Sequence, residues 1–200
     1  NLLTAAGVNR VLTMDLHAPQ IQGFFEIPVD HLYSLPVLIK HLKEKYVKDI
    51  NNLVVVSPDI GGVKTAKSYA NILGTDLAIV AKQRISATEV NAHALIGNVT
   101  GKDVLLVDDM TESGGTLCAA AKILKEHGAA RIFAGVSHAV LNDKARARIT
   151  DSPLECLLAS DSVPMACGCE HVDTVSIAPL FAQAILNIHN NASVTHLFEI

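Results

Sequence analysis

The chain has 200 residues and a formal net charge of −4; 50% of its residues are hydrophobic and only 4% are aromatic. A net negative charge without a basic stripe argues against a nucleic-acid-binding protein, and the few aromatic residues argue against a base-stacking surface. No run reaches the roughly 18 consecutive apolar residues that a membrane span needs. This composition fits one sizeable core, or one domain together with part of another.

The first residues contain no initiator methionine, no basic segment and no cleavage motif. We therefore expect no signal peptide, and we expect the chain to begin inside a longer protein. The four cysteines are Cys118, Cys156, Cys167 and Cys169. They make no disulfide framework at this length, and reduced thiols in a cytosolic protein are the simplest interpretation. The run from Cys167 to His171 lacks a second ligand pair at zinc spacing, which favours two neighbouring loop cysteines over a metal site.

Short apolar runs of strand length alternate with helix patterns along the chain, which is typical of a parallel α/β sheet. Strands are predicted over residues 10–16, 53–57, 77–81, 103–107, 131–137, 154–159 and 172–175. Helices are predicted over residues 35–47, 63–73, 117–127, 142–149 and 179–190. Capping residues agree with these bounds, because Ser34 with Pro36 favours a helix start while Gly74 and Gly128 favour helix ends.

Polar segments follow the first four predicted strands, at the sheet edge where open α/β sheets bind ligands. The most informative is the run from Asp108 to Thr116, in which two adjacent carboxylates precede a Ser/Gly/Thr turn and a helix. Backbone N–H groups at a helix N-terminus suit a phosphate, and carboxylates suit sugar hydroxyls or hydrated Mg²⁺. The run therefore predicts a phosphorylated sugar as ligand.

An ordinary strand-to-helix turn, capped by Ser113 or Thr116, is the alternative interpretation of this run, because such residues commonly cap helices. Two adjacent carboxylates change the balance. They repel each other and are costly to hold together without a cation or hydroxyl partner. We therefore favour sugar-phosphate binding over a simple capped turn.

Several motifs together resemble ribose-phosphate diphosphokinases, also called phosphoribosyl pyrophosphate synthetases. The first is Asp15-Leu16-His17 followed by Gln20-Ile21-Gln22-Gly23-Phe24-Phe25. The others follow in the family's order and are Ser57-Pro58-Asp59 with Gly61-Gly62, Lys82-Gln83-Arg84, Asp108-Asp109, and a tail from Ile188 to Phe198. The resemblance spans essentially the whole chain and implies a phosphoribosyltransferase-like α/β fold, with a parallel, mixed-edge sheet flanked by helices.

The resemblance implies transfer of the β,γ-diphosphoryl group of ATP to the 1-hydroxyl of ribose 5-phosphate, with Mg²⁺ as cofactor, in a homo-oligomer of dimers assembled to a hexamer. It also implies a division of the chain. Residues 1–32 would end a first α/β domain whose front part is absent, residues 33–185 would form the ribose 5-phosphate domain, and residues 186–200 would pack back on the first domain. The absent front part carries much of the family's ATP-binding surface, so we expect an incomplete ATP site and an inactive fragment.

Site residues are carried over from the family position by position. Asp15, His17 and Asp59 would contact the ATP phosphates or their metal, and Glu26 and Asp30 would be outer metal residues, although the family usually has Asp at position 26. Lys82 and Arg84 would be the catalytic cations that grip the transferred group. The ribose 5-phosphate residues would be Asp59, Asp108, Asp109, Thr111, Glu112, Ser113, Gly114, Gly115 and Thr116. The family usually has Asp-Thr where this chain has Glu112-Ser113, and Ser193 and Thr195 lie where the family has a regulatory site.

Two other functions stay open at this stage. A phosphoribosyltransferase uses the same sugar-phosphate loop, but it needs neither the motif from Asp15 to Phe25 nor the pair Lys82 and Arg84. A non-catalytic regulatory homologue of the synthetase would be expected to lose the catalytic cations and the phosphate loop, and this chain keeps both.

Overall fold

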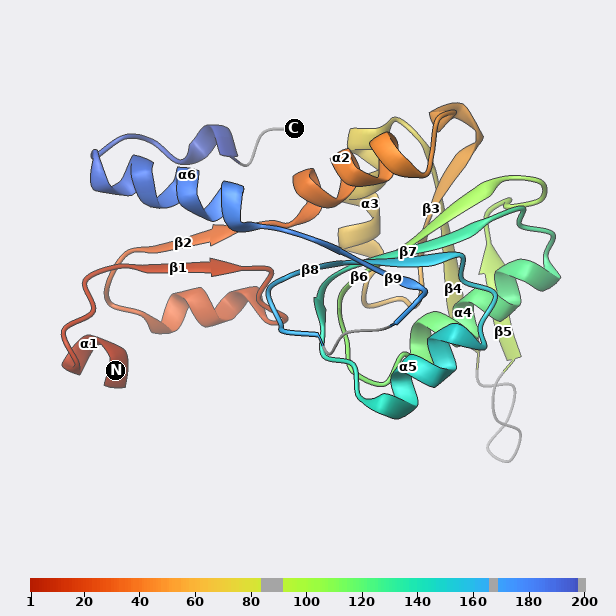
Figure 1. The fold of residues 1–200 in the computed structure, drawn as a ribbon, viewed down its shortest axis with the longest axis horizontal. Coiled ribbons are helices and arrows are strands. Elements are labelled where there is room, and N and C mark those ends of the chain that lie inside the picture. Colours follow the sequence, from red (N-terminus) through yellow and green to blue (C-terminus); the bar gives the residue numbers. More distant parts are fainter. Residues whose placement is uncertain (84–91, 166–168, 198–200) are drawn as a thin grey trace.

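The structure is a computed structural model of the chain, and it describes residues 1–83, 92–165 and 169–197. Within these ranges the larger unit is a seven-stranded sheet with strand order β5-β4-β3-β6-β7-β8-β9 (Figure 1). Its strands are β3 (Leu53–Ser57), β4 (Asp76–Gln83), β5 (Ala92–Ile96), β6 (Asp103–Thr111), β7 (Ile132–Ala139), β8 (Cys156–Ser160) and β9 (Val172–Val175). All neighbours are parallel except β4 and β5. The predicted α/β class with a mixed edge is confirmed.

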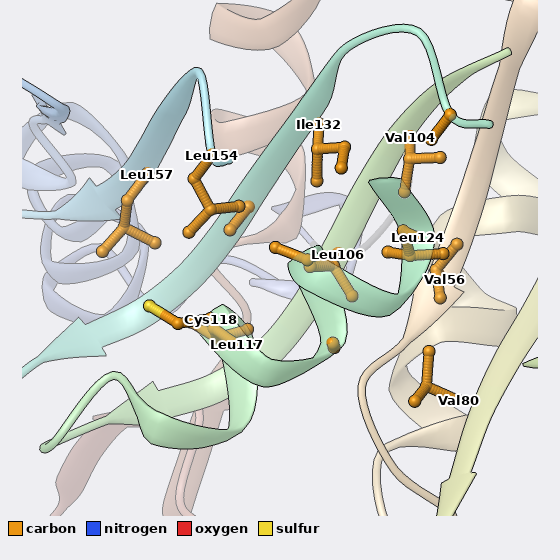
Figure 2. Close-up of a cluster of buried hydrophobic side chains, with 14 of the residues drawn as sticks. Val56, Val80, Val104, Leu106, Leu117, Cys118, Leu124, Ile132, Leu154 and Leu157 are labelled. Carbon is orange, nitrogen blue, oxygen red and sulfur yellow. The ribbon is translucent and has the colours of Figure 1, made fainter. Parts of the chain in front are cut away.

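Helices cover both faces of this sheet. Helices α2 (Leu35–Lys45) and α3 (Val63–Leu73) lie on one face, and α4 (Gly115–Glu126) and α5 (Asp143–Thr150) lie on the other (Figure 1). Successive residues of a strand point to opposite faces, so Val56 packs toward α4 while Val55 packs toward α2 and α3. Figure 2 shows Leu117 and Leu124 of α4 beside the strand residues that they cover. Burial on both faces explains the continuous apolar runs of the central strands.

A second, smaller sheet lies beside the first and consists of the parallel pair β1 (Val11–Met14) and β2 (Val29–Leu32). The last helix, α6 (Ala178–His189), returns from the main sheet to cover this pair (Figure 1). Its Ala184 and the preceding Ile177 pack against Met14 and Leu32. The predicted domain limits at residues 32 and 185 stay predictions. The short elements are α1 (Leu2–Ala5) and the 3-10 turns η1 (Pro19–Phe24), η2 (Ile50–Asn52) and η3 (Thr195–Leu197).

The structure differs from the predicted elements where tertiary pairing extends or ends a strand. Strand β6 runs to Thr111 rather than ending at residue 107, because β7 continues alongside it. Strand β1 ends at Met14, since Asp15 has a positive φ of 40°. Strands β2 and β5 were not predicted. No helix in the described ranges is long and apolar enough to cross a membrane.

Helix caps are partly as predicted. Gly74 ends α3 in the left-handed conformation, with φ of 67°, as its position indicated. Ser34 is the N-cap of α2 but its side chain makes no capping bond. Its hydroxyl instead lies 2.7 Å from the hydroxyl of Ser137 on β7. The prediction that Ser34 caps this helix was therefore wrong about the side chain, because the hydroxyl bonds to a long-range partner and not to the first N–H groups of the helix.

Candidate active site at the switch point of the sheet

The chain leaves β3 toward β4 on one side and leaves β6 toward β7 on the other, so the carboxyl ends of β3 and β6 form a topological switch point. A pocket of about 530 Å³ opens there. Both sheets contribute to its lining, which includes Asp15, His17, Asp59, Asp108 and Asp109. The structure thus brings together five predicted site residues from three separate segments. The pocket also contains side chains that sequence analysis missed, among them Tyr69 of α3 and Ser137 of β7.

The carboxylates near the end of β6 are electrostatically strained. Burial raises the pKa of Asp108 to about 7, and the negative charges of Asp109 and Asp59 add to the effect. The backbone N–H of Asp109 donates to Asp108 Oδ1 at 3.0 Å, and this hydrogen bond offsets only part of the rise in the pKa of Asp108. A cation or hydroxyl donors would relieve this repulsion, and converging carboxylate oxygens are the donors that Mg²⁺ prefers.

The residues present fit a hydrated Mg²⁺ better than a closed protein cage. No group of three or more His, Cys, Asp or Glu side chains in the described part of the chain is assembled to hold a metal ion. A bound Mg²⁺ would therefore complete its shell with water or substrate oxygens, which is usual for this ion at phosphate sites.

The loop after β3 holds Asp59 in a tight turn. Asp59 Oδ1 accepts a hydrogen bond from the Gly62 N–H at 3.0 Å, and the Ser57 hydroxyl donates to the Asp59 carbonyl at 2.6 Å. A Cβ on Gly62 would lie 2.9 Å from the Ser57 hydroxyl oxygen, so the turn leaves no room for a side chain there. Asp59 thus caps a turn and lines the pocket at the same time.

The segment after β1 reaches the same pocket from the smaller sheet. His17 Nδ1 lies 2.7 Å from Asp109 Oδ2, and this hydrogen bond with the charge of Asp109 raises the pKa of the exposed imidazole. Asp15 Oδ2 accepts from the backbone N–H of Ser34 at 2.8 Å and from the Ser137 hydroxyl at 2.5 Å. Both predicted residues therefore contact the main sheet and its loops, His17 directly at the β6 carboxylates.

The predicted phosphate loop forms the start of α4. Its N-cap is Gly114, with φ of 67°, and the preceding Ser113 hydroxyl accepts a hydrogen bond at 3.3 Å from the first helical N–H, that of Gly115. This bond agrees with the alternative of a turn capped by Ser113. Because the first N–H groups of a helix have no intrahelical acceptors, those that follow Gly115 in the first turn are available to an anion. Arg148 of α5 donates from Nη1 to the Ser113 carbonyl at 2.7 Å, a contact that the local sequence did not indicate.

Several predicted residues lie elsewhere. Asp30 is paired with Arg10, with 2.5 Å between Asp30 Oδ2 and Arg10 Nε, and neither Asp30 nor Glu26 is among the described residues that line the pocket. Ser193 and Thr195 bond to each other, with 2.9 Å between their hydroxyl oxygens. Lys82 is placed at the end of β4 by its backbone alone, and Arg84 lies outside the described residues. The exposed Glu112 follows the end of β6.

Comparison with known proteins agrees with this geometry. Residues 83–199 match the model of the phosphoribosyl synthetase-associated domain. The chain belongs to this family. The ribose-phosphate pyrophosphokinase of Chlorobaculum tepidum is 50% identical over 200 residues, which are all of this chain and 61% of the relative. That of Helicobacter pylori is 46% identical, over 99% of this chain and 61% of the relative.

The fold of this family member also matches a solved structure. The crystal structure of phosphoribosylpyrophosphate synthetase from Mycobacterium smegmatis aligns with a TM-score of 0.86 and 35% identity, over 96% of this chain and 62% of that one. The resemblance that the motifs indicated is confirmed. The chain spans about three fifths of the length of these relatives.

Proposed function

We propose that this chain is the ribose 5-phosphate part of a ribose-phosphate diphosphokinase. The whole protein would transfer the β,γ-diphosphoryl group of ATP to the 1-hydroxyl of ribose 5-phosphate, giving phosphoribosyl diphosphate and AMP. The observation that carries this proposal is the meeting of Asp59, Asp108 and Asp109 with His17 at one switch point, in a member of this family.

On the acceptor side, Asp108 and Asp109 hold the ribose 2- and 3-hydroxyls, directly or through Mg²⁺. The loop from Thr111 to Thr116 holds the 5-phosphate with backbone N–H groups, to which the N-terminus of α4 adds a favourable dipole. Sugar hydroxyls donate to the carboxylates and so offset the burial and the repulsion that raise the pKa of Asp108.

On the donor side, Asp15, His17 and Asp59 contact the ATP phosphates, and Lys82 and Arg84 hold the diphosphoryl group during transfer. When bound, Mg²⁺ neutralises phosphate charge and helps to align the reacting oxygens. The ribose 1-hydroxyl attacks the β-phosphorus of ATP while the bond to the α-phosphate oxygen breaks, and AMP leaves. Since this catalysis rests on positioning and charge neutralisation, it needs no covalent protein nucleophile.

The remaining length of the relatives would supply the rest of the ATP site, and we infer that the whole protein works as a homo-oligomer, with dimers assembled to a hexamer. Cys118, Cys156 and Cys169 are free thiols. Free thiols support a reducing, cytoplasmic location.

Isothermal titration calorimetry on the chain tests the acceptor side. Ribose 5-phosphate should bind, ribose without phosphate should bind much more weakly, and Asp109→Asn should weaken the binding of the phosphorylated sugar. Equal affinity for ribose and ribose 5-phosphate would contradict the phosphate loop assignment.

A full-length protein mixed with ATP, Mg²⁺ and ribose 5-phosphate tests the reaction by AMP release. Lys82→Ala should lower turnover at least about 100-fold, a typical loss when one electrostatic group is removed, and should leave ribose 5-phosphate binding intact. Unchanged turnover would refute the role of Lys82. Absence of AMP from the wild-type full-length protein would remove the diphosphokinase proposal.

A further inference from the structure

A buried polar cluster joins the Asp15 segment to the main sheet. This cluster, the Asp15 joint, consists of Asp15, Ser34, Ser137 and His138. Ser34 and Ser137 are almost completely buried, at 0% and 3% exposure. The residues come from the end of β1, the start of α2 and strand β7, so the joint connects both sheets. The proposed chemistry uses none of Ser34, Ser137 and His138, and the sequence motifs account only for the place of Ser34 at the start of α2.

A count of hydrogens gives the direction of each bond in the joint. The Asp15 carboxylate at Oδ2 can only accept, so the single hydroxyl hydrogen of Ser137 points to it, across 2.5 Å. The Ser34 hydroxyl, 2.7 Å from that of Ser137, must then be the donor of their bond. The Ser34 backbone N–H also donates to Asp15 Oδ2, at 2.8 Å. Two of these bonds end on Asp15 Oδ2 and fix its orientation, and the third ends on the Ser137 hydroxyl and supports it.

His138 holds the backbone of the same segment. Its Nε2 lies 3.2 Å from the Met14 carbonyl and 3.1 Å from the Asp15 carbonyl, and since carbonyls only accept, Nε2 carries the hydrogen. The Ser137 carbonyl in turn accepts from Ser160 at 2.6 Å, and the Ser162 hydroxyl lies 3.0 Å from the same carbonyl and 2.7 Å from His138 Nδ1, to one of which its single hydrogen points. Hydroxyls at the end of β8 and just beyond it thus contact β7 at the point where β7 contacts the end of β1.

The hydrogen bonds of the joint also stabilise the bend at Asp15, after which the chain enters the pocket. Asp15 has φ of 40°, a conformation that few non-glycine residues adopt and that persists only where the surroundings enforce it. Two residues later, His17 contacts Asp109 at 2.7 Å. The side chain and the carbonyl of the bent residue are both tied to the joint, so the bend and the place of His17 depend on it.

We propose that Ser137, with Ser34 and His138, is a positioning residue that orients the Asp15 carboxylate and sets His17 opposite the β6 carboxylates. Hydrogen-bonding partners of a ligand carboxylate tune metal and substrate affinity without touching either one. The consequence for ATP rests on the proposed function, whereas the geometric effect does not. A hydroxyl at position 137 is therefore required for the donor side of the site and not for the acceptor side.

Nuclear magnetic resonance on the 200-residue chain tests the geometric effect. Wild type should show nuclear Overhauser effects between the His17 ring and the β-protons of Asp109. Ser137→Ala should lose them, and Ser137→Thr, which keeps the hydroxyl, should retain them. Ser152→Ala is the matched control, because it removes a hydroxyl bonded at 2.7 Å to the Ile149 carbonyl elsewhere in the fold. Retention of the His17 contact in folded Ser137→Ala would overturn the proposal.

If Ser137→Ala does not fold, Ser34→Ala takes its place in the same resonance experiment, since this substitution removes only the hydroxyl that bonds to Ser137.

Steady-state kinetics on the full-length protein give the second readout. Ser137→Ala should raise KM for Mg·ATP about tenfold with KM for ribose 5-phosphate unchanged, and Ser137→Thr should restore it. Equal changes in both KM values would overturn a positioning role. A wild-type enzyme without activity would remove the proposed function, while the resonance result would still decide the joint.

Discussion

The two sides of the candidate site are built in different ways. The acceptor side, from Asp108 to Thr116, is a run of consecutive residues on the central strand and the helix that follows it. The donor side, from Asp15 to His17, leaves a two-stranded sheet and is held at the pocket by contacts with Asp109 and Ser137, which lie 92 and 122 positions away in the sequence. The difference shows that the proposed phosphate loop is a local structure, whereas the position of the proposed donor side depends on tertiary contacts.

The two sides also rest on cores of different size. The acceptor side is backed by large apolar clusters on both faces of the main sheet, including Val107 and Leu106 directly before the carboxylates. The donor side is backed by a small cluster around Met14, Leu32, Ile177 and Ala184. Segments with few buried apolar contacts open more readily than the global fold, so we expect the donor side to open first.

The largest expected effect is a loss of stability that disrupts the acceptor side and the donor side together. Phe133 is fully buried and its ring lies 5.5 Å from that of Tyr46. Phe133→Ala should lower the free energy of unfolding by about 3–5 kcal/mol, measured by urea denaturation. This loss of stability should affect the acceptor side and the donor side alike. Phe24→Ala is the control. Because Phe24 is 78% exposed, this substitution should change the free energy of unfolding by at most about 0.5 kcal/mol. Similar effects of the two variants would refute the assigned core.

A smaller change should separate the two sides. Met14→Ala removes a buried side chain from the small cluster and should cost about 2–3 kcal/mol, chiefly as local opening of β1 and β2. Amide hydrogen exchange should speed up over residues 11–14 and 29–32, while β6 keeps its protection and ribose 5-phosphate still binds. Equal loss of protection in β6 would show that the two sheets unfold as one unit.

The pH dependence of stability tests the strain at the acceptor side. Because the pKa of Asp108 is raised from 3.8 to about 7, the folded chain binds more protons than the unfolded chain between these values. Stability from this group is therefore complete below about pH 4 and is lost as pH rises toward 7. Asp108→Asn should remove that loss, raising the free energy of unfolding at pH 8 by on the order of 2 kcal/mol, reduced from the full shift because the group is partly exposed.

Urea denaturation of wild type and Asp108→Asn at pH 5 and pH 8 measures this difference. The variant should also bind ribose 5-phosphate more weakly, so that stability and binding change in opposite directions. A wild-type chain that gains stability relative to the variant as pH rises from 5 to 8 would contradict the strained carboxylate.

The smallest expected effect concerns the tertiary support of the phosphate loop. Arg148→Ala removes the bond to the Ser113 carbonyl and should weaken ribose 5-phosphate binding about tenfold, which corresponds to about 1.4 kcal/mol. Arg146→Ala is the control on the same helix, since Arg146 pairs with Asp143 instead. Calorimetry should show a change only for Arg148, and equal affinities for both variants would mean that the loop needs no such support.

The sequence by itself determined the α/β class, most element positions and the family, and it contains the whole of the proposed acceptor loop. It could do so because strand and helix periods, helix-ending glycines and the run from Asp108 to Thr116 are properties of neighbouring residues. It placed the hydroxyl of Ser34 wrongly and stopped β6 too early, because the partners that decide both lie on β7.

Only the tertiary structure decided the donor side. The contact of His17 with Asp109 spans 92 positions, that of Asp15 with Ser137 spans 122, and that of Arg148 with Ser113 spans 35. No local pattern encodes such contacts, because they depend on which strands become neighbours in the sheet. The adjacent carboxylates of Asp108 and Asp109 predict a ligand from the sequence alone. The packing of the two sheets against each other determines which other groups face these carboxylates.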